Sequence, residues 1–439
     1  MSNIIAIGIQ WGDEGKGKIV DLLAPEMDVV ARFQGGPNAG HTLIIAGHST
    51  VLHHIPSGVL HRDTLCVIGN GTVVDPDKLL AEIEMLTEGG VPVRQRLKIA
   101  DRCQLIMPWH KQLDSAREAS KKGTLIGTTG CGIGPAYEDK ASRRGIRLAD
   151  LHSDNIEQTI HDNIEYYNYL LVEYYNSSPV TLEEVNGVVQ RTKEELLALT
   201  CDATLFMHQH LQAGSSILFE GAQGSMLDID HGSYPFVTSS NTTAGAALSG
   251  LGVGPHTVDQ VLGIAKAYTT RVGEGPFPTE LYDGEQNLDP DGRQMAEVGK
   301  EFGATTGRLR RTGWFDAVVI RHAVRINGIT GLAITKMDVL DGMESIKIAT
   351  RYRLADDQEG EPIDWIPSTA EQYSRCQPLY EVMPGWSESS YGATDITQLP
   401  DAAVRFLHRI EELCGVPVVM LSTGPERSHV IRLKPAFFD

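Results

Sequence analysis

The sequence predicts an α/β fold in which a large, mainly parallel β-sheet is flanked by helices, with helical and small antiparallel insertions. Three observations favour this fold class. Short apolar runs recur along the chain, helix-periodic segments separate several of them, and the first run leads directly into a glycine-rich loop. Parallel strands need long crossover connections, usually helices, so this alternation is typical of a sheet covered by helices.

The predicted strands are the short apolar runs. The first covers residues 4–9 and ends in glycine and polar residues, so a helix is expected after the loop, over about Lys16–Leu23. The remaining strands are expected at residues 29–33, 65–68, 97–99, 216–219, 261–265 and 332–335. Helical patterns cover residues 77–87 and 314–327.

Two stretches depart from this alternation. Residues from about 154 to 212 are acidic, helix-favouring and nearly free of Gly and Pro, which predicts a helical insertion. Residues from about 349 to 391 carry clustered Pro, Trp and Tyr with weak periodicity, which indicates an irregular or antiparallel excursion. The sequence has no Pro/Ser-rich linker and no internal repeat, so we expect one domain over residues 1–439.

The composition limits the kinds of partner. The chain has 439 residues, of which 41% are hydrophobic and 22% are charged, and its formal net charge is −19. A field of that sign repels polyanions, so nonspecific binding to nucleic acid or to anionic membrane surfaces is disfavoured. Any phosphate must therefore be bound by a local site.

The cysteines and apolar runs indicate the compartment. The six cysteines are scattered without a C-x-x-C pair or metal-ligand spacing, as is usual where thiols stay reduced. Residues 1–10 lack the basic and apolar segments of a signal peptide, and no apolar run reaches the length of about 18 residues needed to span a membrane. We therefore expect a cytoplasmic protein.

A glycine-rich loop follows the first predicted strand. Its residues are Gly12, Asp13, Glu14, Gly15, Lys16, Gly17 and Lys18. Glycines let backbone N–H groups turn toward phosphate oxygens, and the next helix presents its positive end to the same anion. The spacing predicts a P-loop-NTPase-like core, except that Ile19 replaces the Ser or Thr that binds Mg²⁺. Asp13 could supply an oxygen to the metal or act as a base. The alternative is a plain glycine-rich turn.

A second polar segment ends the strand expected at residues 332–335. It reads Thr335-Lys336-Met337-Asp338. A carboxylate here can accept hydrogen bonds from N1–H and the exocyclic amine of guanine, while the lysine stem stacks along the ring. Adenine lacks that donor pair and would leave the carboxylate unpaired, which favours GTP. A solvated turn would also place Lys and Asp here, so this interpretation depends on the glycine-rich loop.

Other loops gather small residues around polar side chains. They cover residues 35–42, 127–130, 221–224, 234–243, 303–308 and 422–425. His41 could donate a proton to a transferring phosphoryl group or could simply cap a turn. Residues 303–308 run on into Arg310 and Arg311, whose guanidinium groups suit carboxylates and phosphates. Taken alone, Arg143 and Arg144 would be explained by surface ion pairs.

Together these segments resemble the adenylosuccinate synthetase family over essentially the whole chain. The matching motifs are Gln10-Trp11-Gly12-Asp13-Glu14-Gly15-Lys16-Gly17-Lys18, Asn38-Ala39-Gly40-His41-Thr42, Gly132-Ile133-Gly134-Pro135-Ala136-Tyr137, Phe219-Glu220-Gly221-Ala222-Gln223-Gly224, Pro384-Gly385-Trp386-Ser387 and Ser422-Thr423-Gly424-Pro425. So many long matches in one order are far more specific than any single loop.

The resemblance implies a GTP-dependent ligase that joins L-aspartate to inosine monophosphate (IMP). GTP phosphorylates O6 of IMP, and the aspartate amine then displaces that phosphate at C6, on the purine-biosynthetic route to AMP. By the same resemblance, Asp13 is the base at N1 and a Mg²⁺ ligand, and the Gly40 carbonyl is a second ligand. His41 would stabilise the γ-phosphoryl group as it transfers.

The resemblance also assigns residues to each substrate. GTP would be bound by Gly12, Asp13, Glu14, Gly15, Lys16, Gly17, Lys18, Gly40, His41, Thr42, Arg310, Lys336, Met337, Asp338, Ser422, Thr423 and Gly424. IMP would be bound by Asp13, Lys16, Asn38, Ala39, Gly40, His41, Thr129, Arg143, Gln223, Thr238 and Arg308. Aspartate would be bound by Ala304, Thr305, Thr306, Gly307, Arg308, Leu309 and Arg310. Arg143 is expected to reach the site of a partner subunit, so the enzyme would be a homodimer.

Three residues depart from the pattern of close bacterial relatives, namely Pro37, Cys131 and Leu309, and each replaces a bulkier polar or charged side chain. They put secondary contacts in doubt but leave the base, acid and metal ligands unchanged. Two other functions remain open. A regulatory P-loop GTPase would also have the phosphate loop and the Lys-Met-Asp segment, although it needs the hydroxyl that is absent at position 19. A ligase that activates a carboxylate would share the phosphate loop.

Overall fold

The structure is a computed structural model. It describes residues 2–38, 40–45, 48–120, 130–282, 289–302, 310–355 and 360–438, and for residues 41–45 and 48–50 it describes the backbone alone. Within these ranges, no helix is long and apolar enough to cross a membrane.

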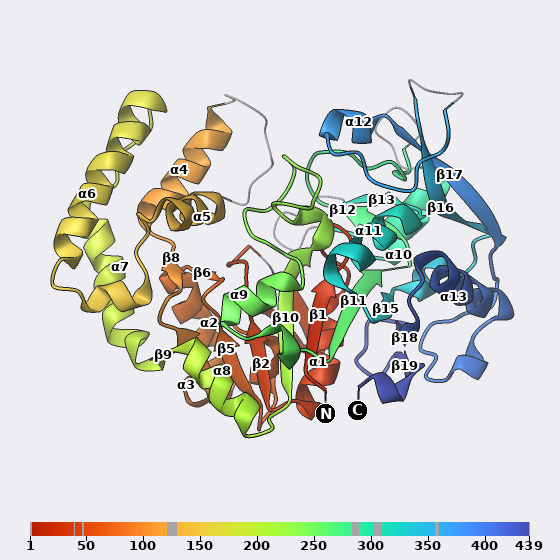
Figure 1. The fold of residues 1–439 in the computed structure, drawn as a ribbon, viewed down its shortest axis with the longest axis horizontal. Coiled ribbons are helices and arrows are strands. Elements are labelled where there is room, and N and C mark those ends of the chain that lie inside the picture. The colour runs from red at the N-terminus through yellow and green to blue at the C-terminus, as the bar shows by residue number, and fades with distance from the viewer. Residues whose placement is uncertain are drawn as a thin grey trace.

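A ten-stranded sheet forms the centre of the described molecule (Figure 1). Its strand order is β19-β18-β15-β11-β1-β10-β2-β5-β7-β9. The edge strand β19 is antiparallel to β18, and the other neighbouring pairs are parallel, which confirms the predicted mainly parallel sheet. The strands are β1 (Ile4–Gly8), β2 (Val29–Arg32), β5 (Leu65–Ile68), β7 (Leu97–Ala100), β9 (Thr200–Cys201), β10 (Ile217–Gly224), β11 (Gln260–Lys266), β15 (Gly331–Thr335), β18 (Val418–Ser422) and β19 (Val430–Arg432).

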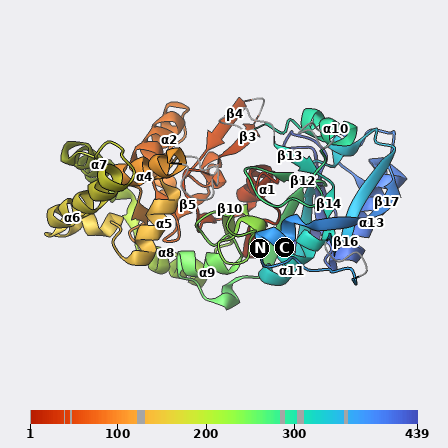
Figure 2. The same ribbon diagram turned by 90° about the horizontal axis from the view of Figure 1, so that it is seen from above.

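Thirteen α-helices surround the strands in the described ranges. They are α1 (Lys16–Leu23), α2 (Pro76–Glu88), α3 (Val93–Arg96), α4 (Pro108–Ala119), α5 (Ile133–Ser142), α6 (Ile156–Tyr169), α7 (Leu182–Glu195), α8 (Ala203–Gln212), α9 (Gly245–Leu251), α10 (Pro290–Val298), α11 (Ala317–Asn327), α12 (Ala370–Ser374) and α13 (Asp401–Cys414). Helices α4 to α7 gather at one end of the molecule, and α12 and α13 lie at the other (Figures 1 and 2). The central sheet lies between these two ends.

Four small sheets complete the described fold. Strands β3 (His41–Ile45) and β4 (His48–Leu52) pair antiparallel, as do β12 (Thr269–Arg271) and β13 (Arg311–Gly313). The other two sheets are β6 with β8, which are parallel, and β14-β16-β17, in which β16 is parallel to β14 and antiparallel to β17. Their bounds are β6 (Val73–Val74), β8 (Gln104–Leu105), β14 (Phe315–Asp316), β16 (Ser345–Leu354) and β17 (Cys376–Pro384).

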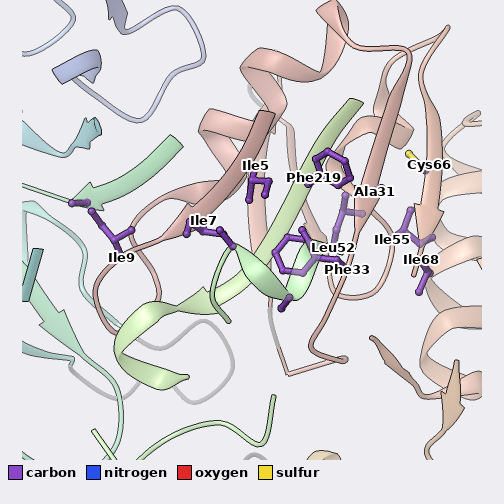
Figure 3. Close-up of a cluster of buried hydrophobic side chains, with 14 of the residues drawn as sticks. Ile5, Ile7, Ile9, Ala31, Phe33, Leu52, Ile55, Cys66, Ile68 and Phe219 are labelled. Carbon is purple, nitrogen blue, oxygen red and sulfur yellow. The ribbon is translucent and has the colours of Figure 1, made fainter. Parts of the chain in front are cut away.

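The core explains why the apolar runs are continuous. Side chains alternate between the faces of a strand, so a strand covered on both faces needs apolar residues at every position. On β1, Ile4 and Ala6 pack with α1 residues on one face, while Ile5 and Ile7 belong to the larger core on the other. Figure 3 shows that second face, where Phe219 of β10 lies beside the β1 side chains. Every residue of β1 is buried.

The predicted elements agree closely with the structure, and two boundaries differ from the prediction by more than one residue. Helix α1 and strand β5 have the predicted bounds. Helix α11 begins at Ala317, not at residue 314, because the side chain of Asp316 accepts from the N–H groups of Val318 and Val319 and so caps the helix there. Strand β10 continues five residues past its predicted end, to Gly224.

The two stretches that break the alternation have the following structures. Residues 156–212 contain α6, a π-helical turn at Leu170–Tyr174, α7 and α8, and also β9, which joins the edge of the central sheet. The stretch from about 349 to 391 contains most of the β16-β17 antiparallel pair and the short helix α12. Both stretches therefore lie outside the centre of the sheet.

Candidate active site

The predicted site residues lie at the carboxyl ends of the parallel strands in the central sheet. Strands β1, β2, β10, β15 and β18 are parallel, so their carboxyl ends reach the same edge. The loop after β1 carries Asp13, the loop after β2 carries Asn38, and β10 ends at Gln223 and Gly224. Asp338 follows β15 and Gly424 follows β18. The fold therefore brings five distant sequence segments together.

Backbone strain marks several of the same residues. Among the described residues, six non-glycine residues have a positive φ, and four of them were predicted to bind ligands: Asp13 (59°), Arg143 (63°), Gln223 (59°) and Lys336 (57°). One of the other two is Lys300 (51°). The left-handed region is costly for residues with a Cβ and persists where the surrounding structure imposes it, often at functional sites.

Glu14 shapes the glycine-rich loop from inside. Its side chain is fully buried, and Oε1 accepts from the N–H groups of Gln10 (3.0 Å) and Gly12 (2.9 Å). Oε2 forms an ion pair with Lys16 Nζ at 2.7 Å. A Cβ at Gly224 would lie 2.5 Å from Glu14 Oε1, so glycine is required there for space. The carboxylate thus fixes the loop through its own backbone.

Lys18 joins the glycine-rich loop to the segment after β18. Its Nζ donates to Ser422 Oγ (2.7 Å) and to the carbonyl oxygens of Gly424 (2.7 Å) and His429 (2.8 Å). Burial lowers the pKa of Lys18 to about 8, although nearby carboxylates, Asp338 among them, favour the charged form. The three acceptors hold the ammonium in one place, where its charge can attract a phosphate.

The segment after β15 carries a buried acceptor without a partner. Asp338 lies in the short helix Met337–Leu340, and its Oδ1 is buried with no hydrogen-bond partner among the described residues. Burial raises the pKa of Asp338. Because a buried unpaired acceptor is costly, such an atom indicates a ligand donor. Lys336 donates from Nζ to Gly299 O (2.6 Å) and to Glu301 Oε1 (2.7 Å).

Asp13 faces a cation in the described structure. Its Oδ2 forms an ion pair with Arg310 Nε at 2.8 Å, and its side chain is 35% exposed. The described residues contain no cluster of three or more His, Cys, Asp or Glu side chains that could hold a metal. One carboxylate and the carbonyl of Gly40, an exposed residue, suit Mg²⁺, which usually takes one or two carboxylates and completes its shell with phosphate oxygens and water.

Residues predicted to bind the nucleoside monophosphate meet at the end of β10. Gln223 Nε2 donates to Asn38 Oδ1 at 3.3 Å, while Gln223 Oε1 is buried without a partner among the described residues. Thr238 is half-buried, and its N–H donates to Leu227 O at 2.9 Å. This side of the site therefore also offers an unpaired acceptor.

Tyr137 of α5 fixes the loop that carries Asn38. Its hydroxyl donates to Gly71 O (2.7 Å) and accepts from the N–H of Gly35 (3.0 Å). Tyr137 belongs to a motif that the sequence singled out without giving this residue a role. In the structure, its hydroxyl holds the loop after β2 in place.

The two neighbouring arginines that follow α5 have different surroundings in the structure. Arg144 Nε forms an ion pair with Asp139 Oδ1 (3.1 Å), and its guanidinium lies 4.1 Å from the ring centroid of Tyr166. Arg143 is exposed, and its side chain has no hydrogen-bond or ion-pair partner in the described ranges. The ion-pair explanation therefore fits Arg144 and leaves Arg143 available to a ligand or a partner.

Some predicted residues lie outside the described ranges. They are Ala39, Thr129 and the segment from Ala304 through Thr305, Thr306, Gly307 and Arg308 to Leu309. The side chains of His41 and Thr42 also lie outside the description, although their backbone belongs to β3. Their assignments stay predictions.

Glu301 and Lys266 are two residues of the site that the sequence analysis did not single out. Glu301 is fully buried and forms ion pairs with Lys266 (2.8 Å), Lys336 (2.7 Å) and Arg310 (3.1 Å). A lysine at the end of the buried strand β11 is the one signal that could have been noticed, because charged residues are rarely buried without a partner.

Comparisons with known proteins identify the family. The profile of the adenylosuccinate synthetase family matches residues 5–431. The adenylosuccinate synthetase of Psychromonas ingrahamii is 53% identical over 436 residues, 99% of each chain, and adenylosuccinate synthetase 1 of Pseudoalteromonas translucida is 54% identical with the same coverage. The solved structure of fully ligated adenylosuccinate synthetase from Plasmodium falciparum has a TM-score of 0.91 and 36% identity, covering 98% of this chain and 100% of that chain. The resemblance is confirmed, and the chain belongs to the adenylosuccinate synthetase family.

Proposed function

We propose that the carboxyl edge of the central sheet joins L-aspartate to IMP at the expense of GTP, yielding adenylosuccinate, GDP and phosphate. One observation carries the proposal. Asp338 keeps a buried carboxylate oxygen with no partner among the described residues, close enough to the phosphate loop for its charge to act on Lys18. A guanine base supplies two adjacent N–H donors for such an acceptor, and adenine does not.

The reaction needs a base at N1 and a route for charge at O6. Asp13 removes the N1 proton of IMP, so that O6 becomes nucleophilic and attacks the γ-phosphorus of GTP. The bond between the β–γ bridging oxygen and the γ-phosphorus breaks, GDP leaves, and 6-phosphoryl-IMP forms. The aspartate amine then attacks C6, the C6–O6 bond breaks, and phosphate leaves as the amine loses a proton. His41 stabilises the phosphoryl group during transfer.

The donor set fits Mg²⁺, and we propose Asp13 and the Gly40 carbonyl as its protein ligands. A bound Mg²⁺ would neutralise phosphate charge at this place. The ion pair between Asp13 and Arg310 means that a cation already balances this carboxylate in the described structure. Position 19 is an isoleucine, whose side chain has no hydroxyl to bind Mg²⁺ and is fully buried in α1. A regulatory GTPase needs that hydroxyl, so its absence counts against this function.

The remaining contacts follow the sequence assignment. IMP would be held by Asn38, Gln223, Thr238, Thr129 and Arg308, and aspartate by residues 304–310. We also propose a homodimer in which Arg143 binds IMP in the partner's site, because its exposed guanidinium has no partner among the described residues. We propose a cytoplasmic location, in keeping with six cysteines that remain thiols.

A turnover assay tests the function. The purified protein is incubated with GTP, Mg²⁺, IMP and aspartate, while phosphate release and absorbance near 280 nm are followed. We expect both signals only when IMP and aspartate are both present. Phosphate release from GTP alone at the same rate would contradict the proposal and favour a GTPase. Turnover with another amine or acceptor in place of aspartate or IMP would indicate a different ligase.

A further inference from the structure

Glu301 occupies a buried position between the guanine side of the active site, at Lys336, and the phosphate side, at Arg310. It follows α10, and its side chain is fully buried. Lys300, the residue before it, has a positive φ of 51°, and the Glu301 N–H donates to Ala296 O at 2.8 Å. The Glu301 carbonyl accepts from the N–H of Arg310 at 2.9 Å. The backbone thus fixes where this carboxylate points.

Four side chains converge on the two oxygens of Glu301. Oε1 accepts from Lys266 Nζ (2.8 Å), Tyr268 OH (2.6 Å) and Lys336 Nζ (2.7 Å). Oε2 accepts from Arg310 Nη1 at 3.1 Å. Lys266 and Tyr268 belong to the buried interior, whereas Lys336 and Arg310 are the two donors that were predicted to contact GTP.

The charge balance makes this carboxylate necessary for the cations around it. Burial alone would raise the pKa of Glu301, but Lys266 and Lys336 outweigh it and hold that pKa well below its usual range. Lys266 is fully buried as well, and this burial lowers its pKa to about 8. Without Glu301, cations would be left buried beside one another, a costly arrangement.

We propose that Glu301 is a positioning residue for GTP, which holds Lys336 beside the guanine site and Arg310 beside Asp13 without touching the nucleotide itself. The inference rests on the proposed function. Lys336 bonds to Gly299 and Glu301 through its ammonium, so its methylene stem is the part left to lie along a purine ring. Arg310 is shared between Glu301 and Asp13, so one carboxylate connects the guanine side of the site with the phosphate side.

The variant Glu301→Gln tests this inference. An amide accepts on one oxygen and donates from its nitrogen, so it cannot serve both Lys336 and Arg310. We expect the KM for GTP to rise and the affinity for GDP in calorimetry to fall, each by about tenfold, since a hydrogen bond to a charged group is lost. The KM for IMP should stay within about twofold, because Glu301 makes no contact with Asn38 or Gln223 and reaches Asp13 only through Arg310.

Two further variants separate positioning from stability. The double variant Glu301→Gln with Lys266→Met removes one buried charge of each sign, so it should recover melting temperature while GDP affinity stays low. Asp316→Asn is the matched control, since Asp316 is also a buried carboxylate but caps α11 and accepts from Tyr352. It should lower the melting temperature and leave the KM for GTP within about twofold.

The outcomes distinguish this inference from the proposed function. If the wild-type protein turns over with GTP but Glu301→Gln keeps wild-type GDP affinity, the inference is wrong and the function stands. Recovery of both stability and GDP affinity in the double variant would also overturn it, because the role would then be structural. If Glu301→Gln does not fold, the GDP affinity of the double variant alone tests the inference. Absence of wild-type turnover would instead contradict the proposed function.

Discussion

The two sides of the active site are built differently. On the nucleotide side, Lys18 has three acceptors within the chain, Glu14 fixes the phosphate loop, and Glu301 gathers four donors. On the IMP side, Gln223 and Asn38 share one bond of 3.3 Å, and Arg143 has no side-chain partner among the described residues. Apart from Asp338 Oδ1, the chain supplies partners for these groups on the nucleotide side, whereas it leaves Arg143 and Gln223 Oε1 on the IMP side to ligands.

This difference indicates how each side gains affinity. A preorganised side loses little conformational entropy when it binds, so its affinity depends on a few polar groups such as Asp338. A side with unpaired groups must be ordered by the ligand or by a second subunit. Substitutions on the nucleotide side should therefore change GTP binding alone, and those on the IMP side should change IMP binding and depend on the oligomer.

Asp13 lies where the two sides meet, and Asp13→Asn should have the largest effect. An amide cannot remove the N1 proton, so kcat should fall by about 10²–10⁴-fold, the range of general-base catalysis. The fold should be unchanged, because Asp13 is partly exposed and its one ion pair among the described residues is with Arg310. Steady-state kinetics and a melting curve measure the two effects. Turnover close to the wild-type rate would refute the role of Asp13 as the base.

Asp338→Asn tests the nucleotide side by itself. The amide offers one acceptor and one donor, so it loses a charge-assisted bond to guanine but matches the N1–H donor and O2 acceptor of xanthine. We expect the KM for GTP to rise by about 10–100-fold, from a loss of about 1.5–3 kcal/mol, and the KM for XTP to fall. The KM for IMP is the control. A change of similar size in the KM for IMP would show that the two sides of the site are not independent.

Arg143→Leu tests the IMP side and the proposed dimer. We expect the KM for IMP to rise by about tenfold, since one charged hydrogen bond is lost, with the KM for GTP unchanged. Mixing this variant with Asp13→Asn should restore activity, because a mixed dimer contains one site with both residues intact. Random exchange of equal amounts should give about a quarter of the wild-type rate.

The mixing experiment needs proof that subunits exchange. Mass spectrometry of differently tagged variants supplies it. If mixed dimers form and the rate stays at the level of the single variants, Arg143 does not act in the partner's site. A rise in the KM for IMP without that recovery would place Arg143 in its own subunit's site.

Local signals explain what the sequence predicted about the fold. Strand β5 and helix α1 were predicted with their bounds because a buried parallel strand is apolar throughout and the glycine-rich loop marks the start of the helix. The end of β10 was missed because Gly221 and Gln223 are not typical strand residues. They extend the strand because β10 stays paired with β1 as far as Gly224. Strand β9 has two residues inside a helical stretch, too short for any period to appear.

In the site, too, features with a local sequence signal were predicted and features that depend on distant residues were not. The phosphate loop and the Lys336-to-Asp338 segment are contiguous, so their chemistry is visible in the sequence. Glu301 was missed because its partners Lys266, Tyr268 and Arg310 come from separate elements that meet only after folding. A buried charged residue is defined by neighbours in space, and a single sequence does not contain them.

The smallest expected effect is the dependence of GDP affinity on pH, which concerns the nucleotide side alone. Burial lowers the pKa of Lys18 from 10.5 to about 8, so its protonated fraction falls by about tenfold between pH 7 and pH 9. The affinity for GDP should fall by up to the same factor, because a neutral amine no longer attracts phosphate, while IMP affinity stays constant. Stability should not fall with it. Between pH 8 and 10.5 the unfolded chain keeps a proton at this lysine that the folded chain has lost, so this group makes the free energy of unfolding rise with pH.

Calorimetry with GDP and IMP at pH 7, 8 and 9 measures the titration. Lys266 has a pKa of about 8 as well, so two variants are needed to assign the effect. Lys18→Met should bind GDP weakly at pH 7 and lose most of the pH dependence, whereas Lys266→Met should keep it. The opposite pattern would mean that the Lys266 and Glu301 pair, and not the phosphate loop, carries the pH response of the nucleotide side.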